Sequence, residues 1–248
     1  MPPTDATPPP QAANPGLDPR AFDQYAAEYD QALNQGLKFT GEAKEFFAQT
    51  RLEWTRAVMG SGYQPGGRCL DFGCGTGTAA PFLHAILQPA SITGVDTSAD
   101  SCALARTEHR ALGAAFGHPD ELEGQREQFD FAYCNGVFHH IPPSERERAI
   151  QLVFNALKPG GWFALWENNP WNPITRLLMA LVPFDRDAIM LWPRETRRRL
   201  EGAGFRIVRT DFLFIFPSAL GFLRPLERWV CKTPAGAQYL VLAQKPAS

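Results

Sequence analysis

The stretch LDFGCGTGTAA, residues 70–80, decides how the rest of the chain folds. It begins at the end of an apolar run typical of a buried strand, and a helical pattern follows it. Gly73, Gly75 and Gly77 remove three β-carbons, so a tight turn can adopt positive φ and backbone N–H groups can approach a ligand closely. The helix that follows directs the partial positive charge of its N-terminus to the same point. The stretch therefore predicts a strand, a glycine turn and a helix that together bind a nucleotide-like ligand.

Two acidic residues narrow the kind of ligand. Asp96 closes the next apolar run, about 20 residues beyond the glycine turn, where an acid binds ribose hydroxyls. Dinucleotides and S-adenosylmethionine both contain this ribose. Asp71 distinguishes them, because a carboxylate beside the turn repels a pyrophosphate but suits an ammonium or a sulfonium. Thr78 also replaces the third glycine of a dinucleotide fingerprint, so the sequence favours S-adenosylmethionine over NAD.

Length and composition set further limits. The chain of 248 residues suits one α/β domain with insertions. A net charge of −2 gives no electrostatic indication of a nucleic-acid partner. We expect neither a membrane span nor a secretory signal, because no apolar run approaches the roughly 18 residues that a span requires. The 5 cysteines lack Cys-x-x-Cys spacing and favour a reducing compartment, so we expect a cytoplasmic protein.

Strand and helix patterns alternate along most of the chain. This alternation predicts an α/β fold: a Rossmann-like, seven-stranded, mostly parallel sheet with helices on both faces and an antiparallel last strand. We expect strands at residues 68–72, 91–95, 114–116, 129–134, 162–166, 205–211 and 238–243. We expect helices at residues 41–58, 78–87, 98–112, 144–157, 174–182 and 194–201. Residues 158–161 predict a turn into the fifth strand.

From about Phe22 to its end, the chain resembles the class I S-adenosylmethionine-dependent methyltransferases. The resemblance is carried by residues 70–80, 94–96, 129–142 and 157–161. It is specific for the superfamily and says little about the substrate, although residues 166–187 are similar to a bacterial subfamily. It implies S-adenosylmethionine as the cofactor.

The resemblance also divides the chain. We expect a disordered, proline-rich tail at residues 1–20, an N-terminal helical lid at 21–60, and a class I methyltransferase domain at 61–248 with insertions at 168–193 and 212–230. The lid segment could instead pack its aromatic residues on the core.

The expected cofactor contacts come from the glycine turn, the ends of the strands and the lid. They are Asp71, Gly73, Cys74, Gly75, Gly77, Asp96, Thr97, His118, Cys134, Asn135, Tyr25 and Tyr29. The family often has an acid after the third strand that binds adenine. Here His118 takes that place and Asp120 follows two residues on, so which of the two meets adenine stays open, as do backbone contacts.

Candidate catalytic groups follow the fourth and fifth strands. His139 or His140 could act as a base, because an imidazole titrates near working pH, or the pair could cap a turn and pack under the cofactor. Adjacent histidines point apart and have no third ligand at a recognisable spacing, so we expect no metal. Glu167 should face the open cleft as a base or an orienting group, or else anchor a loop.

The insertion after Glu167 supplies the expected acceptor contacts. These are Asn168, Asn169, Trp171, Asn172 and Arg176, whereas residues 185–187 more readily form an internal ion pair.

We therefore predict in-line methyl transfer to a small-molecule acceptor, such as a hydroxylated metabolite or a glycan- or lipid-linked intermediate. Two alternatives stay open: an NAD-linked oxidoreductase, and a cofactor-binding protein without catalysis that acts through its partners. The aromatic residues of 212–222 could form core, a homodimer contact or a wall for an apolar acceptor.

Overall fold

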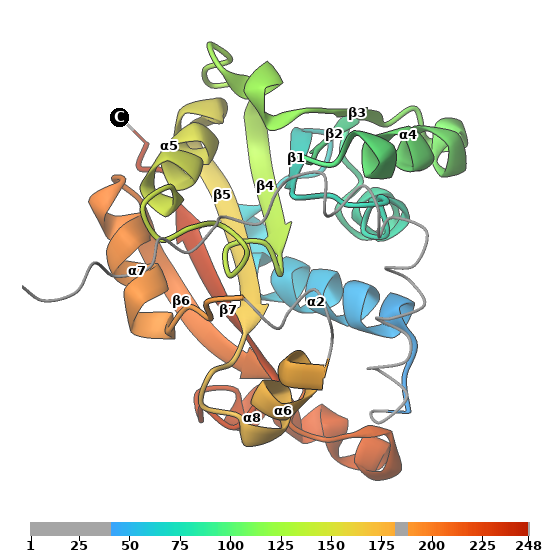
Figure 1. Ribbon diagram of the computed structural model, residues 1–248, viewed down its shortest axis with the longest axis vertical. Helices are drawn as coiled ribbons and strands as arrows, with labels where there is room; N and C mark the ends of the chain where they lie inside the picture. The colour runs from blue at the N-terminus through green and yellow to red at the C-terminus, as the bar shows by residue number, and fades with distance from the viewer. Residues whose placement is uncertain (1–40, 182–187, 248) are drawn as a thin grey trace, which may run out of the picture.

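Seven strands form one mixed sheet in the order β3-β2-β1-β4-β5-β7-β6 (Figure 1). The structure is a computed structural model that describes residues 41–181 and 188–247. β7 runs antiparallel to both of its neighbours, β5 and β6, and the other neighbouring strands pair in parallel. The predicted seven-stranded Rossmann-like sheet with an antiparallel last strand is confirmed. The strands are β1 (Arg68–Phe72), β2 (Ser91–Val95), β3 (Ala115–Gly117), β4 (Phe129–Asn135), β5 (Leu157–Asn168), β6 (Arg206–Leu213) and β7 (Gln238–Gln244).

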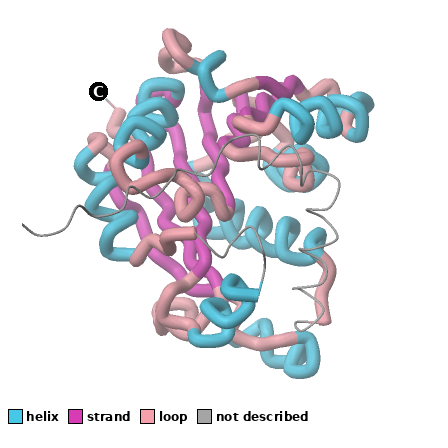
Figure 2. Tube along the Cα trace, in the orientation of Figure 1, coloured by secondary structure: helices cyan, strands magenta, loops and turns pink. Residues whose placement is uncertain are grey.

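Helices cover both faces of the sheet (Figure 2), as parallel strands require, because each crossover must pass over a face. The longer helices are α2 (Lys44–Met59), α4 (Ala99–Glu108), α5 (Arg146–Ala156), α6 (Pro173–Leu181) and α7 (Pro193–Gly202). Shorter helical turns are η1 (Gly60–Gly62), α3 (Ala80–Phe82), η2 (Leu83–Leu87), η3 (Arg110–Leu112), η4 (Pro119–Leu122), η6 (Ser218–Leu226) and α8 (Glu227–Val230).

Side chains of the central strands alternate between two cores. On β4, Cys134 packs in the core that includes Ile150 of α5, whereas the neighbouring Tyr133 packs in the core that includes Leu52 of α2. This period of two places successive residues on opposite faces of the sheet. Both faces are buried, which is why the strands read as continuous apolar runs in the sequence.

β1 lies at the point where the direction of strand addition reverses. The chain builds outward from β1 to β2 and β3, then crosses back to place β4 on the other side of β1. Asp71 pairs with Gly94 of β2 and with Tyr133 of β4. The carboxyl ends of β1, β2 and β4 therefore meet at a topological switch point, where α/β sheets bind ligands.

Two predicted elements take a different form. The helix expected at residues 78–87 begins only at Ala80 and passes after one turn into the π-helical turn η2, because Gly75 and Gly77 hold positive φ and prolong the turn. The turn expected at 158–161 is a bulge inside β5, since Phe129 pairs with Leu157 but Phe131 already pairs with Trp162.

Some predictions fall outside the described residues: the tail at 1–20, the first part of the lid with Tyr25 and Tyr29, and residues 185–187. The second part of the lid segment is α2. Within 41–181 and 188–247, no helix has the length and apolar character needed to cross a bilayer.

Candidate active site

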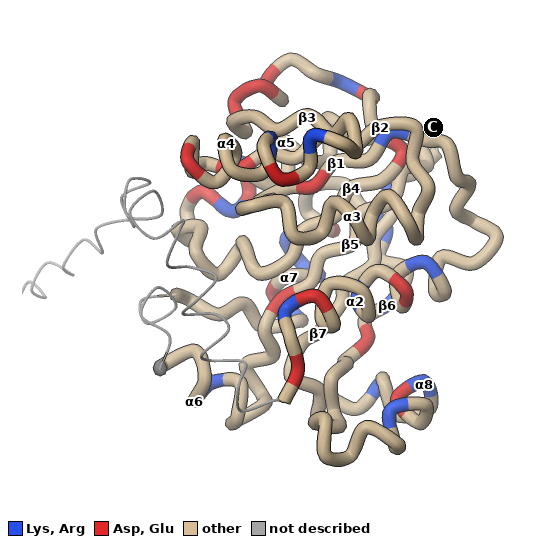
Figure 3. The backbone as a smooth tube through the Cα atoms, turned by 90° about the vertical axis from the view of Figure 1, so that its right-hand side faces the viewer, with Lys and Arg blue, Asp and Glu red and all other residues tan. Residues whose placement is uncertain are grey.

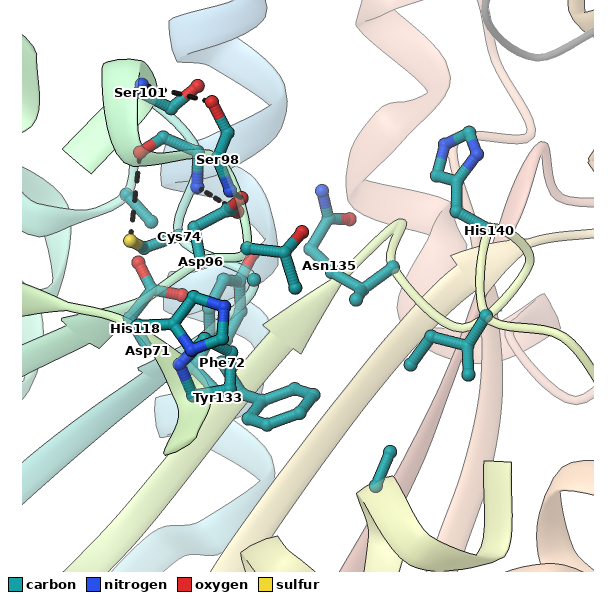
Figure 4. A pocket seen from close by; sticks show the side chains of 18 of the residues that line it. Asp71, Phe72, Cys74, Asp96, Ser98, Ser101, His118, Tyr133, Asn135 and His140 are labelled. Carbon is teal, nitrogen blue, oxygen red and sulfur yellow. Dashed lines mark hydrogen bonds between the residues drawn. The ribbon is translucent and has the colours of Figure 1, made fainter. Parts of the chain in front are cut away.

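A cavity of about 450 Å³ opens at the carboxyl ends of β1, β2 and β4. Figure 4 shows Asp71, Asp96 and His118 together on one side of it, with Asn135 and His140 toward the other. α2 and α5 complete its walls, so the cavity lies where the switch point predicts it.

The glycine turn lines this cavity, and internal hydrogen bonds fix its backbone. Gly73 N–H donates to the carbonyl of Val95 at 2.8 Å, and Gly75 N–H donates to Oδ2 of Asp96 at 2.8 Å. A β-carbon on Gly73, which has φ of 75°, would lie 2.2 Å from a methyl carbon of Val137. These N–H groups therefore bind β2 and Asp96 rather than point at a ligand. This corrects the expectation that these two N–H groups approach a ligand.

Asp96 directly follows β2 and lines the cavity. Its Oδ1 accepts the N–H of Ser98 at 2.9 Å, and its Oδ2 accepts the N–H of Gly75. Burial raises the pKa of Asp96, and these two hydrogen bonds offset only part of that effect. Each carboxylate oxygen has a further lone pair, so Asp96 can still accept hydroxyl groups from a ligand.

Asp71 and Asn135 each carry an oxygen without a hydrogen-bond partner. Asp71 is 2% exposed, and both its Oδ2 and the Oδ1 of Asn135 are buried and unsatisfied within the described part of the chain. Burial, reinforced by the charge of Asp96 and opposed by that of Arg51, raises the pKa of Asp71 to about 7. Unsatisfied buried acceptors cost free energy, so this wall of the cavity suits a ligand that donates hydrogen bonds or carries positive charge.

Arg51 reaches the cavity from α2 and was not predicted from the sequence. Its Nε donates to the hydroxyl of Tyr133 at 3.0 Å, and its Nη1 donates to Oε1 of Gln238 at 2.9 Å. Lys44 and Ala48 of the same helix also line the cavity. The available signal was a charged residue on the buried helical face that also carries Ala48, Leu52 and Thr55.

His118 and Asp120 both line the cavity next to Asp96. Nδ1 of His118 accepts the N–H of Asp120 at 3.3 Å and caps η4. The His118 side chain is 49% exposed and that of Asp120 is 73% exposed. Val137, Ile141 and Leu152 also line the cavity and provide apolar surface.

Glu167 does not face an open cleft, which corrects the expectation. Its side chain is fully buried: Oε1 accepts the N–H groups of Val137 at 3.1 Å and Phe138 at 2.7 Å, and Oε2 lies 2.6 Å from Nδ1 of His139. Burial favours the neutral acid, but the charge and hydrogen bond of His139 and the N–H of Phe138 outweigh it, so the pKa of Glu167 is lowered. Glu167 thus takes the alternative role of a loop anchor.

The two histidines differ in burial, but their rings lie against each other, which corrects the expectation that adjacent histidines point apart. His139 is buried against Glu167 and does not line the cavity, whereas His140 does. Their ring centroids lie 4.1 Å apart. Among the predicted catalytic groups, only His140 borders the cavity.

The predicted acceptor residues lie away from this cavity and serve the fold. Asn169 is fully buried, and its Nδ2 donates to the carbonyls of Pro234 and Gly236. Oδ1 of Asn172 accepts the N–H groups of Ile174 and Thr175 and so caps α6. The remaining three are also absent from the lining: Oδ1 of Asn168 accepts from Gln238, Trp171 packs against Trp192 and Phe212, and Arg176 is exposed. Short amide side chains satisfy nearby backbone groups, which explains their density in this insertion.

Of the predicted cofactor contacts, those lining the cavity are Asp71, Gly73, Cys74, Gly75, Asp96, Thr97, His118 and Asn135. Gly77 and Cys134 lie outside the lining. Gly77 packs its backbone against His109, where a β-carbon would come within 2.6 Å of the ring, and Cys134 points into the core.

Comparison with known proteins agrees with this geometry. A family profile described as "Methyltransferase domain" matches residues 69–161, from β1 through the start of β5. The chain is 34% identical over 111 residues to phthiotriol/phenolphthiotriol dimycocerosates methyltransferase of Mycobacterium tuberculosis, covering 44% of this chain and 40% of that protein. It is 30% identical over 165 residues to trans-aconitate 2-methyltransferase of Rhodopseudomonas palustris (strain BisB18), covering 64% of this chain and 57% of that protein.

Residues 69–161 match a methyltransferase domain, although the chain spans less than two thirds of the length of these two relatives. A SAM-dependent methyltransferase from Thermotoga maritima has the same fold, with a TM-score of 0.63 at 21% identity over 91% of this chain and 98% of that one. Geranyl diphosphate C-methyltransferase from Streptomyces coelicolor, crystallised with S-adenosyl-L-homocysteine, also has this fold. Its TM-score is 0.58 at 15% identity, over 79% of this chain and 78% of that one. The methyltransferase match agrees with the expected cofactor, S-adenosylmethionine, and gives no support to the NAD-linked alternative.

The residues of the methyltransferase domain fit that cofactor. A zwitterionic methionyl group needs a carboxylate for its ammonium and a cation for its carboxylate, and the cavity offers Asp71 and Arg51. This fit rests on the unsatisfied oxygens of Asp71 and Asn135, which can accept hydrogen bonds from the ammonium group.

Proposed function

We propose that the protein transfers a methyl group from S-adenosylmethionine to a small-molecule acceptor. The best supporting observation is that one cavity contains both a buried carboxyl with an unsatisfied oxygen, Asp71, and a guanidinium, Arg51. When bound, S-adenosylmethionine supplies an electrophilic methyl group on a positively charged sulfur.

In this proposal the chain binds the cofactor at its methionyl group, its ribose and its adenine. Asp71 and Asn135 accept from the ammonium group, and Arg51 donates to the methionyl carboxylate. Asp96 accepts from the ribose hydroxyls. His118 and Asp120 border the adenine, with Val137 and Ile141 as its apolar wall. The gains come from charge-assisted hydrogen bonds in a partly water-excluded site.

The proposed catalytic base is His140. It lines the cavity beyond Asn135, and an imidazole can take a proton from an acceptor hydroxyl or amine near neutral pH. Glu167 and His139 are positioning residues. Glu167 holds the N–H groups of Val137 and Phe138 and the ring of His139, and thereby fixes the loop that presents His140.

The acceptor is proposed to be a hydroxylated metabolite or a glycan- or lipid-linked intermediate. The small negative net charge argues against a nucleic acid. The 5 cysteines are free and buried in the structure, which supports a reducing compartment, and we assign the protein to the cytoplasm.

Two measurements test this proposal. Titration calorimetry should detect binding of S-adenosylmethionine and S-adenosylhomocysteine but not of NADH. Incubation with methyl-labelled cofactor and cell extract should transfer label to the small-molecule fraction. Failure to bind either sulfur compound, or label that enters only protein or RNA, would contradict the proposal. Once an acceptor is known, His140→Ala should slow transfer and change its pH profile while S-adenosylhomocysteine still binds.

A further inference from the structure

Large apolar side chains are exposed at one end of the molecule. Phe222 is 76% exposed, Trp229 72%, Ile174 67% and Leu177 61%. Leu220 and Leu226 are also exposed. We call these six side chains the apolar end. Large apolar side chains that gather at one exposed end of a folded protein usually mark an interaction site.

The apolar end comes from two segments that lie at the same level of the molecule. Ile174 and Leu177 belong to α6, and the other four side chains belong to η6 and α8. Figure 1 places both segments at the lower end of the longest axis, and Figure 3, turned by 90° about that axis, places them there again. Figure 3 also shows α6 and α8 on opposite sides of this end, so they form two apolar areas that a flat surface as wide as the end can meet together.

Internal hydrogen bonds hold these segments in place. The buried carboxylate of Glu227 accepts the N–H groups of Phe214, Ile215 and Phe216 at 3.0 to 3.2 Å. On the other segment, the hydroxyl of Thr175 donates to the carbonyl of Ala237 at 3.0 Å. The exposed side chains thus project from a fixed support.

Four of the five charged residues in 173–181 and 218–233 are positive. Glu227 is the acid of residues 218–233, and its carboxylate is buried and bound to backbone N–H groups. Arg224 and Lys232 pair with Glu42 and Asp211. Among the described residues, Arg176 and Arg228 have no acidic partner, so they carry the surplus positive charge.

This combination selects between two occupants. A symmetric dimer would bury the surplus cations of both copies in one interface, where like charges repel. An anionic bilayer instead attracts the arginines and accepts the tryptophan and phenylalanine rings at headgroup level.

We propose that the apolar end docks the protein on the surface of an anionic lipid bilayer, as a peripheral contact. This goes beyond the proposed function, because cofactor binding and methyl transfer do not themselves require it. The surface adjoins the cavity through α2: Arg224 stacks on the ring of Phe46 at 4.4 Å, and the same helix supplies Lys44 and Arg51 to the cavity. Docking would therefore bring the α2 wall of the cavity close to the bilayer.

Vesicle flotation with the full chain tests the proposal. We expect the protein to float with vesicles of phosphatidylcholine mixed with phosphatidylglycerol, to float much less with phosphatidylcholine alone, and to lose binding as salt rises. Phe222→Ser combined with Trp229→Ser should lower the partition coefficient more than about tenfold. Arg176→Glu combined with Arg228→Glu should lower it at least about fivefold.

Matched controls carry the same kinds of change elsewhere. Val208→Ser alters an exposed apolar residue of β6, and Arg126→Glu alters an exposed arginine in the turn before β4. Both should bind vesicles as the unchanged protein does. All variants should keep their melting temperature and their affinity for S-adenosylhomocysteine, which separates a failure of docking from a failure of the proposed cofactor site.

Two results would overturn the proposal. The first is equal behaviour of the apolar-end variants and the controls on anionic vesicles, including no binding by any of them. The second is sedimentation showing a dimer that the apolar-end substitutions dissociate, without vesicle binding, which would make a second copy the occupant.

Discussion

Oε2 of Glu167 lies 2.6 Å from Nδ1 of His139, and both side chains are almost completely buried. Glu167 lies next to the last residue of β5 and His139 follows β4, so this contact joins two neighbouring strands beyond their ladder. It fixes the loop from which His140 borders the cavity.

Replacement of Glu167 by glutamine should destabilise the protein by about 3 kcal/mol, because the amide oxygen can keep the two backbone N–H groups but the amide nitrogen then faces Nδ1 of His139, which loses its charged acceptor. Urea unfolding measures this, with the exposed Glu201→Gln as the control. The contribution of Glu167 should also depend on pH. Because its folded pKa is lowered, its stabilisation is present above the ordinary value of 4.5 and is lost as pH falls through the folded pKa. Unchanged stability with lost activity would instead indicate a catalytic carboxylate.

Cofactor affinity should depend on pH through Asp71. Its pKa of about 7 means that the carboxyl is ionised above that pH and protonated below it. The attraction for the ammonium of S-adenosylhomocysteine should therefore reach a plateau above about pH 8 and fall by up to about tenfold per unit below about 6. Calorimetry across this range checks the prediction. Asp71→Asn should bind weakly and flatten the profile, and an unaltered profile in that variant would assign the titration to another group.

Arg51→Gln should weaken S-adenosylhomocysteine binding about 10- to 100-fold, the effect expected for loss of a charge-assisted hydrogen bond to a carboxylate. Adenosine lacks that carboxylate, so its affinity should change little. Arg56→Gln, on the same helix outside the cavity lining, is the matched control. Equal losses for both ligands would mean that Arg51 acts only through its hydrogen bonds to Tyr133 and Gln238.

Asp96→Ala should weaken S-adenosylhomocysteine and adenosine together, by on the order of 100-fold, because both contain the ribose that we assign to this residue. Asp100→Asn, in the exposed first turn of α4, should have no effect. A loss for one ligand only would contradict the assignment. The contrast with Arg51 distinguishes the ribose end of the cavity from the methionyl end.

Most of the sheet could be predicted because its signals are local. The bounds of β1 and β2 agree with prediction to the residue, since each is a short apolar run ended by glycine or by Asp96. Ser98, the first residue of the predicted helix at 98–112, caps α4 by accepting the N–H of Ser101. The helix after the glycine turn was placed too early, because positive φ at Gly77 delays it.

The site residues also divide into those that the local sequence identified and those that it did not. Asp71, Asp96 and the glycine turn lie within 30 residues of one another and identify the cofactor by their order along the chain. Arg51 and the acceptor side could not be assigned in that way. Asn169 and Asn172 looked like ligand contacts, but their hydrogen-bonding capacity is used by the carbonyls of residues 234–236 and by the cap of α6.

The amino-acid sequence by itself determined the parallel sheet, the glycine turn and the preference for S-adenosylmethionine, because period, turn chemistry and charge at fixed spacing act over short distances. Only the tertiary structure decided that Glu167 is buried against His139, that Arg51 meets Asp71 in one cavity, and that α6 and α8 share an exposed end. Those relationships join strands and helices far apart in the chain, and packing rather than local spacing sets which side chains meet.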